Sequence, residues 1–406
     1  MFFGDLYMEM EGNHKLFPHF EAAPHDLRLS FDTLIEEKIK NFVGREVLFK
    51  EIDKFLEDEG NDSGYLIIRG EPGIGKTAFI AKLVKDRGFI HHFNIISQNI
   101  RTISHFISNI SSQLISLYNL DSLYVPLDYL YDGAFLSTCL EEAAKKRGNE
   151  KIVIVIDALD ESDQSTLAPG VNALYLPHSL PKGVYFIITT RFLKDFHLNV
   201  SKIRILDLKS DSPYNMEDVK RYIECYNQRQ QMKERLKIMN VEKKDFIETL
   251  CKKSQGNFMY LYYVLPAIEN GNFSEGTLDE LPEGLKGYYN RHWLQMKNIS
   301  SSQSFENVYE SIVFALSIVQ EPVSIEWISD LMDIEESDVR DAINYWREFL
   351  FEHKNNGILV YRIYHTSFQE FLKEKTDLKK YHRNIAEKGL KNLLNRGIIK
   401  NSLEMK

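Results

Sequence analysis

The sequence contains few cysteines and no hydrophobic run long enough to cross a membrane. The 406 residues include 3 cysteines, an odd number. Cys139, Cys225 and Cys251 lie too far apart for a compact metal motif, so we expect reduced thiols in an intracellular protein. The most apolar stretch, Phe258–Leu265, is far shorter than the roughly 20 residues that span a bilayer. Residues 1–15 also lack a signal-peptide pattern. These absences predict a cytoplasmic protein that does not bind membranes.

The sequence also lacks an excess of basic residues and any internal repeat. Its 50 Lys and Arg stand against 59 Asp and Glu, which gives a net charge of −9 and disfavours polyanion binding by the chain as a whole. We find no repeat of about 20–50 residues and no low-complexity tract. The chain length predicts two to four domains.

Apolar stretches alternate with helical patterns over residues 31–212. This alternation predicts an α/β fold with a doubly wound parallel sheet. Two of the stretches are continuous apolar runs, which is typical of strands that are buried on both faces. The predicted strands are 65–69, 89–95, 151–156, 184–190 and 203–208, and the predicted helices between them are 76–87, 102–118 and 135–147.

The strand signal stops near residue 212. The stretches 216–231, 241–253, 258–269 and 285–297 predict helices, and more helices follow from residue 305. A short strand is expected at 357–364, and three helices with a small hairpin suggest a winged-helix unit. The predicted organisation is an irregular leader (1–30), a P-loop nucleotide-binding domain (31–212), a helical lid domain (213–298) and a winged-helix domain with a C-terminal helix (299–406).

The strongest motif is GEPGIGKT at residues 70–77, which fits G-x-x-x-x-G-K-[ST] at every fixed position. Its glycines allow successive backbone N–H groups to face one anion, and the next helix points its N-terminus at the same place. Lys76 offers an ammonium to the β- and γ-phosphates, and the hydroxyl of Thr77 can ligate Mg²⁺. The residues predicted to bind the phosphates are Gly70, Pro72, Gly73, Ile74, Gly75, Lys76, Thr77 and Ala78.

A second motif, KIVIVIDALDE at residues 151–161, is an apolar strand that ends in acidic residues. The strand places Asp157 beside the phosphate loop, where it can orient Mg²⁺ directly or through water. Either Asp160 or Glu161 could polarise a water molecule for attack on the γ-phosphate. We prefer Glu161, although both could simply cap the next helix. Arg191 follows the strand at 184–190 and could contact the γ-phosphate, although an arginine after a strand is also common on protein surfaces.

Five segments in this order resemble the STAND group of P-loop proteins (signal-transduction ATPases with numerous domains), on its NACHT-like side. They are NFVGRE (41–46), GEPGIGKT (70–77), DALDE (157–161), QGNFMY (255–260) and YRIYHTSFQEF (361–371). The resemblance implies that the Phe42–Val43 backbone lines the adenine, that Arg45 helps to fix the nucleotide, and that His365 touches the diphosphate in the resting state. Phe258 or Met259 stands where related switches carry a proline, so the resemblance does not identify the adenine-side contact.

The resemblance implies a nucleotide-gated switch that binds ATP or ADP with Mg²⁺ and hydrolyses ATP slowly. Exchange of ADP for ATP would open the chain and expose an oligomerising surface, and a homo-oligomer is expected in the ATP state. The segments before residue 40 and after His365 are each about 40 residues long. We therefore expect either that effector and sensor proteins act in trans or that the chain is a split or shortened gene product. Antiviral defence or programmed cell death in a prokaryote is the expected setting.

Two alternatives stay open at this point. The first is an AAA+ ATPase of the initiator type that acts on DNA through its winged helix. Residues 351–406 carry 12 Lys or Arg against 6 Asp or Glu, but we favour a solvated basic face of the predicted helix 377–406 as the explanation. The second alternative is a scaffold that binds the nucleotide without hydrolysing it.

Overall fold

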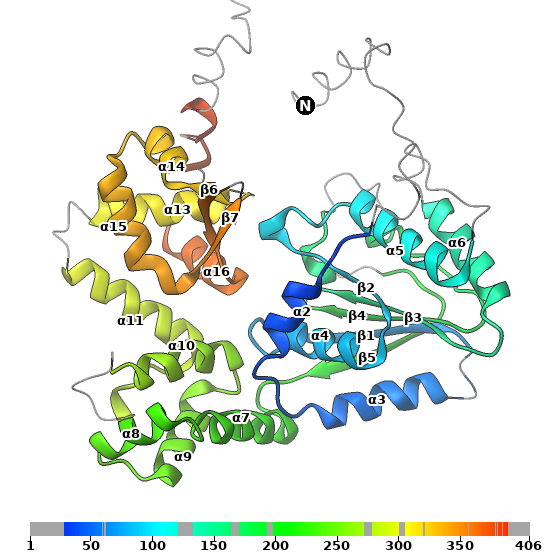
Figure 1. Cartoon of the computed structure of the whole chain (residues 1–406), viewed down its shortest axis with the longest axis horizontal. Coiled ribbons are helices and arrows are strands. Elements are labelled where there is room, and N and C mark those ends of the chain that lie inside the picture. The colour runs from blue at the N-terminus through cyan, green and yellow to red at the C-terminus, as the bar shows by residue number, and fades with distance from the viewer. Residues whose placement is uncertain are drawn as a thin grey trace, which may run out of the picture.

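In the computed structural model, the described part of the chain comprises residues 28–388, except for 59, 61, 121–132, 164–169, 193–197, 272–277, 300–304, 320, 356, 378, 380 and 384. Residues 1–27 of the predicted leader and residues 389–406 of the predicted C-terminal helix therefore lie outside it. The described residues between 379 and 388 are helical. Figure 1 shows a sheet-containing part beside a part made mainly of helices. No helix in the described ranges is long and apolar enough to cross a bilayer.

A five-stranded parallel sheet forms the centre of the first part, in the order β2-β3-β4-β1-β5. The parallel α/β prediction is therefore confirmed, and all five predicted strands are present. The fourth and fifth begin and end at the predicted residues, whereas the second is shorter. The strands are β1 (Gly64–Gly70), β2 (Ile90–Phe93), β3 (Ile152–Asp157), β4 (Val184–Thr190) and β5 (Ile203–Leu208).

Helices cover both faces of this sheet, as Figure 1 shows. Alternate residues of β3 face opposite sides: Ile154 and Ile156 pack with α5 and α6, whereas Val153 and Val155 pack with α2, α3 and α4. Every residue of β3 and β4 is buried, as their continuous apolar runs predicted. The helices are α2 (Asp32–Ile39), α3 (Glu46–Glu57), α4 (Lys76–Arg87), α5 (Ile103–Tyr118) and α6 (Gly133–Lys146).

A group of helices follows the sheet. Ser212 caps α7 and Pro213 occupies its first turn, so the helix starts earlier than predicted. The single helix predicted at 216–231 is wrong, because the chain turns after Tyr226 and a new helix begins at Gln230. The helices are α7 (Pro213–Tyr226), α8 (Gln230–Ile238), α9 (Lys243–Ser254), α10 (Phe258–Glu269) and α11 (Gly284–Ile299).

The last described segment combines helices with a three-stranded antiparallel sheet in the order β6-β8-β7. The strand expected at 357–364 is present as β8, paired with β7 in a hairpin. The elements are α13 (Ser311–Ile318), β6 (Val323–Ser324), α14 (Ile325–Met332), α15 (Glu336–Trp346), β7 (Leu350–Asn355), β8 (Ile358–Ile363) and α16 (Thr366–Lys375).

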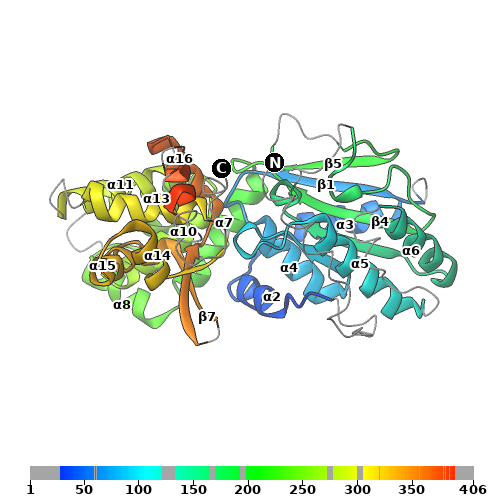
Figure 2. The same ribbon diagram turned by 90° about the horizontal axis from the view of Figure 1, so that it is seen from above.

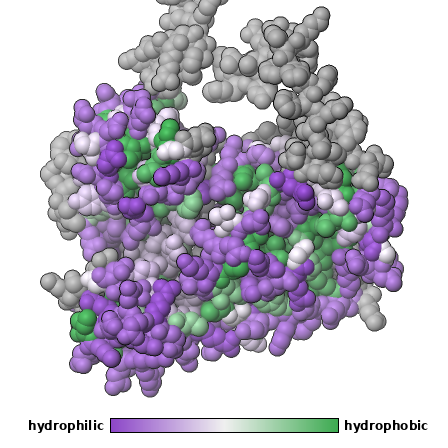
Figure 3. All heavy atoms as spheres, in the orientation of Figure 1, coloured by the Kyte–Doolittle hydropathy of each residue, from purple (hydrophilic) through white to green (hydrophobic). Residues whose placement is uncertain are grey.

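The helices after the sheet and the C-terminal segment share one hydrophobic core. Phe349 stands at its centre and packs against Tyr263 of α10, Tyr289 of α11 and Phe368 of α16, with ring centroids 5.3, 5.4 and 4.3 Å away. Figures 1 and 2 both show this C-terminal segment beside the sheet-containing part. On the face seen in Figure 3, hydrophobic residues gather mainly over the sheet-containing half.

Candidate functional site

The loop between β1 and α4 forms the base of the site. Gly73 and Gly75 have φ angles of +80° and +94°, a region of backbone conformation that residues with a Cβ atom rarely adopt. The ammonium of Lys76 bends back over the loop and donates to the carbonyl oxygens of Gly70 and Glu71, at 2.6 and 3.0 Å. Burial lowers the pKa of Lys76 to about 8, although the carboxylates of Asp160 and Asp157 raise it in part. The loop therefore presents a partly desolvated cation to its concave side.

Asp157, at the acidic end of β3, lies beside Thr77, the residue that follows Lys76. Asp157 is 2 % exposed and accepts hydrogen bonds from the hydroxyls of Thr77 (2.8 Å) and Thr189 (2.6 Å). Thr189 in turn accepts a hydrogen bond from the backbone N–H of Ala158, at 2.9 Å. Burial raises the pKa of Asp157, whereas the two hydroxyl donors lower it. Hydroxyl and carboxylate oxygens are ligands that Mg²⁺ prefers, together with the oxygens of substrate phosphates.

The two acidic residues after the strand, which the sequence could not separate, have different partners. Asp160 is bound to Arg191: its carboxylate lies 2.9 Å from Nε and accepts from the backbone N–H of Arg191 at 3.2 Å. Glu161 accepts a 3.3 Å hydrogen bond from the backbone N–H of Ile96. Burial, together with the neighbouring Asp160, raises the pKa of Glu161 to about 7. Asp160 therefore orients Arg191, whereas Glu161 is held by a backbone N–H group.

Arg191 also connects the sheet to the C-terminal segment. Its guanidinium donates to the carboxylate of Glu370 and to the hydroxyl of Thr366, both on α16. Arg191 lies at the end of β4, as predicted, but no local sequence pattern indicates its contacts with α16. One cation joins β4, the acidic edge of β3 and α16.

His365 caps the N-terminus of α16. Its Nδ1 accepts from the backbone N–H of Ser367 at 3.2 Å, so the proton of the neutral ring resides on Nε2. Burial and the positive charges of Lys38, Arg191 and Lys76 lower the pKa of His365 to about 3. The ring is therefore neutral at physiological pH and can offer one N–H donor.

The segment 41–46 and the start of α10 close the other end of the site. The guanidinium of Arg45 donates to the carbonyl of Ile74 at 2.5 Å, pairs with Asp218 at 3.5 Å and lies 5.0 Å from the ring centroid of Phe258. The resemblance gave Arg45 a role in holding the nucleotide. Its guanidinium here holds the phosphate loop against α7 and α10.

The capping residue of α10 binds the phosphate loop directly. Asn257 donates to the carbonyl of Pro72 at 3.0 Å, and the backbone N–H groups of Phe258 and Met259 donate to the carbonyl of Gly73 at 3.0 and 3.2 Å. The sequence placed residues 255–260 near the base but did not single out Asn257. An Asn immediately before an apolar helix was the signal that could have done so.

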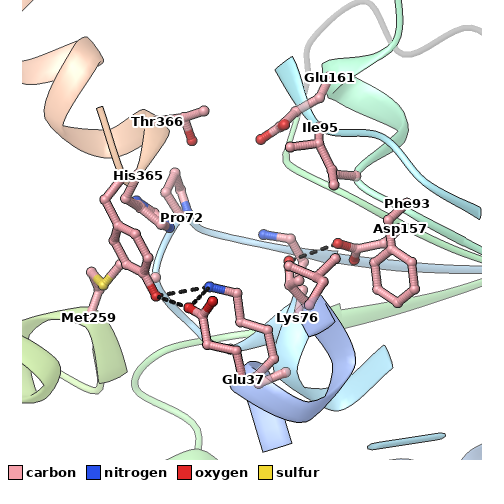
Figure 4. Close-up of a pocket in the computed structure, with 18 of the residues that line it drawn as sticks. Glu37, Pro72, Lys76, Phe93, Ile95, Asp157, Glu161, Met259, His365 and Thr366 are labelled. Atoms are coloured by element: carbon pink, nitrogen blue, oxygen red, sulfur yellow. Dashed lines mark hydrogen bonds and ion pairs between the residues drawn. The ribbon is translucent and has the colours of Figure 1, made fainter. Parts of the chain in front are cut away.

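These parts enclose a cavity of about 460 Å³, within the range typical of small-molecule sites. Figure 4 shows Glu161 and Thr366 facing each other across it, with Lys76 and Asp157 on the sheet side and His365 and Met259 on the helical side. The predicted site residues that line the cavity are Phe42, Val43, Arg45, Pro72, Gly73, Gly75, Lys76, Thr77, Ala78, Asp157, Asp160, Glu161, Arg191 and His365.

Two predicted residues do not line this cavity. The side chain of Ile74 is 1 % exposed and packs in the core beneath the loop. Gly70 meets Leu208 and contributes its carbonyl to Lys76. Among the described residues, no group of three or more His, Cys, Asp or Glu could hold a metal ion by itself. Bound Mg²⁺ would therefore rely on phosphate oxygens and water in addition to Thr77 and Asp157.

The parallel sheet, the glycine loop at the end of β1 and the acidic edge of β3 define a P-loop NTPase fold. The family model described as "Nephrocystin 3, N-terminal" matches residues 47–191, a range that contains this loop, this edge and Arg191. Together with the motifs described above, this match supports a STAND-group, NACHT-like P-loop NTPase. No curated protein sequence matches the chain significantly.

Solved structures show more distant similarity. A STAND protein with a tetratricopeptide repeat sensor, from Pyrococcus horikoshii, is 17% identical, with a TM-score of 0.45. The alignment covers 89% of this chain, which spans only 46% of that protein. Drosophila ORC bound to DNA (15% identity, TM-score 0.36) aligns over 84% of this chain and 98% of its own. A Thermotoga maritima RuvB mutant is 12% identical, with a TM-score of 0.31, and the alignment covers 82% of this chain and 96% of that one.

Proposed function

We propose that the chain is an ATP- and ADP-binding switch that hydrolyses ATP slowly and whose C-terminal segment responds to the state of the nucleotide. The observation that carries the proposal is the composition of the cavity wall. The phosphate loop and the edge of β3 form one side, and His365 and Thr366 of the C-terminal segment form the other. A nucleotide in this cavity would contact both parts, so its state can bias their arrangement.

Each residue has a distinct task in this proposal. Lys76 and the N–H groups of the loop bind the β- and γ-phosphates, and the neutral His365 donates from Nε2 to a phosphate oxygen. Thr77 and Asp157 would hold Mg²⁺, which, when bound, neutralises phosphate charge. Glu161 orients the attacking water and accepts its proton. The Phe42–Val43 backbone lies on the adenine side.

Slow turnover agrees with the contacts of Glu161 and Arg191. Glu161 is held by the N–H of Ile96, and its raised pKa leaves part of the population protonated at neutral pH. Arg191 is paired with Asp160 and with α16. We propose that opening of the C-terminal segment, interpreted as a winged-helix domain, accompanies ATP binding and exposes an oligomerising surface. A role in antiviral defence or cell death, with sensor and effector acting in trans, stays a prediction.

The direct test is nucleotide binding by calorimetry together with native mass spectrometry, with and without ATP and Mg²⁺. Lys76→Ala should abolish binding. Lys82→Ala is the matched control, because Lys82 lies on the same helix and pairs with Asp86 on its exposed side, at 2.7 Å. We expect a larger particle with ATP only in the wild type and in the control. Folded wild-type protein that binds no adenine nucleotide would refute the proposal.

Hydrolysis and DNA binding are tested separately. Glu161→Gln should bind ATP but hydrolyse it at least about 100-fold more slowly, the lower range for loss of a general base. Unaltered ATP consumption by this variant would contradict Glu161 as the proton acceptor and would leave Asp160. Salt-dependent retardation of a DNA fragment by the wild type would favour the initiator-type alternative.

A further inference from the structure

Arg191 is contacted from two directions, and each group that contacts it binds a different nitrogen of the guanidinium. Nε faces the carboxylate of Asp160 at 2.9 Å. Nη1 donates to Glu370 and Nη2 donates to Thr366, both on α16. The Arg191 side chain is 19% exposed, whereas that of Glu370 is 46% exposed. The guanidinium is therefore engaged on its edge toward β3 by one carboxylate and on its edge toward α16 by another.

The same guanidinium lines the phosphate end of the cavity. Lys76, Asp160, Glu161 and Thr366 line this end too. Lys76 and Arg191 line the same cavity, so the two cations act on one region of space. A terminal phosphate held by Lys76 would therefore lie within the field of Arg191.

The charges around Arg191 would act differently on a bound diphosphate and on a bound triphosphate. A γ-phosphate adds negative charge, and its oxygens can accept bidentate hydrogen bonds from guanidinium N–H groups. In the present arrangement Glu370 and Thr366 occupy those groups on the side toward α16. His365 is neutral and adds no positive charge in compensation. A diphosphate bound by the loop leaves these contacts in place.

We propose that Glu370 sets the preference of the closed chain for ADP over ATP, because its carboxylate accepts from Nη1 of Arg191, a donor that a γ-phosphate would otherwise bind. The inference rests on the proposed function and names the regulation of the same site. When ATP binds, the γ-phosphate displaces Glu370, and α16 loses its ion pair to the sheet-containing part. Glu370 is a selectivity residue that acts through Arg191.

The test is the ratio of the dissociation constants for ADP and ATP, measured by calorimetry with Mg²⁺ for the full chain. Glu370→Gln keeps the shape and removes the charge, and should shift the ratio toward ATP by about threefold to tenfold, the size expected of a partly exposed ion pair. Glu374→Gln is the matched control. It lies on the same helix and pairs with Lys286 at 2.5 Å, with its side chain 59% exposed, and it should leave the ratio unchanged.

A double-mutant cycle separates this selectivity from a structural role. In an Arg191→Gln background, Glu370→Gln should no longer shift the ratio, because the competed donor is absent. A role of Glu370 in stability alone would change both dissociation constants alike and leave the ratio constant. If the wild type binds nucleotide and Glu370→Gln keeps its ratio, this inference is wrong and the proposed function stands. If the folded wild type binds neither nucleotide, both are wrong.

Discussion

The attachment of α10 to the phosphate loop through Asn257 allows a quantitative prediction. Its Oδ1 accepts from the backbone N–H groups of Met259 and Tyr260 at 2.9 and 3.2 Å, and its Nδ2 donates to the carbonyl of Pro72 at 3.0 Å. Loss of an N-cap costs about 1 kcal/mol, and loss of one hydrogen bond costs about 1 kcal/mol more. Asn257→Ala should therefore destabilise the first turn of α10 by about 2 kcal/mol.

A second variant separates the two contributions. Asn257→Ser keeps a capping oxygen, but its shorter side chain does not reach Pro72. It should cost about 1 kcal/mol, all of it from the contact between α10 and the loop. The control is Ser212→Ala, which removes the cap that accepts from the backbone N–H of Asn215 in α7.

Hydrogen exchange measures this local stability residue by residue. Exchange of the Met259 and Tyr260 amides should accelerate about 30-fold in Asn257→Ala and about fivefold in Asn257→Ser, if opening is followed by fast reclosing. Ser212→Ala should accelerate exchange in α7 and leave these two amides unchanged. Less than about threefold acceleration in Asn257→Ala, or equal rates in the two Asn257 variants, would refute the assigned roles of Asn257.

Three further predictions follow from the site. Because burial raises the pKa of Glu161 to about 7 and the base must be ionised, single-turnover ATP hydrolysis should fall about tenfold per pH unit below 7 and level off above it; a flat profile between about pH 5.5 and 8 would contradict this. Gly73→Ala should weaken ATP binding at least about tenfold in calorimetry, since a Cβ there lies 2.5 Å from the side chain that caps α10 and φ is +80°; Gly88→Ala, with φ +64° and nothing within 4 Å, should bind normally. Thr189→Val removes the hydroxyl that donates to Asp157 at 2.6 Å. It should lower the free energy of unfolding by about 1–3 kcal/mol, measured by thermal unfolding, and weaken Mg²⁺-dependent ATP binding. Thr189→Ser should restore both properties, and an unchanged melting temperature in the valine variant would count against the role of this hydroxyl.

Elements with a strong local signal were predictable. The apolar runs of β3 and β4 can be satisfied only by burial on both faces, so their place inside a covered parallel sheet followed from the sequence. The glycine loop was predictable because its backbone geometry and the position of Lys76 are set within eight residues. The break between α7 and α8 was missed, because the polar residues between them are compatible with a continuing helix.

The sequence by itself therefore determined the parallel α/β sheet, the phosphate loop and the acidic strand end, because each depends on residues that are neighbours in the chain. Tertiary structure alone decided that Asp160 pairs with Arg191 and that Glu161 accepts from the backbone N–H of Ile96. Arg191 meets Glu370 across 179 positions, and Arg45 meets Asp218 across 173. Such contacts depend on how the segments pack against one another, and neither periodicity nor spacing along the chain records that packing.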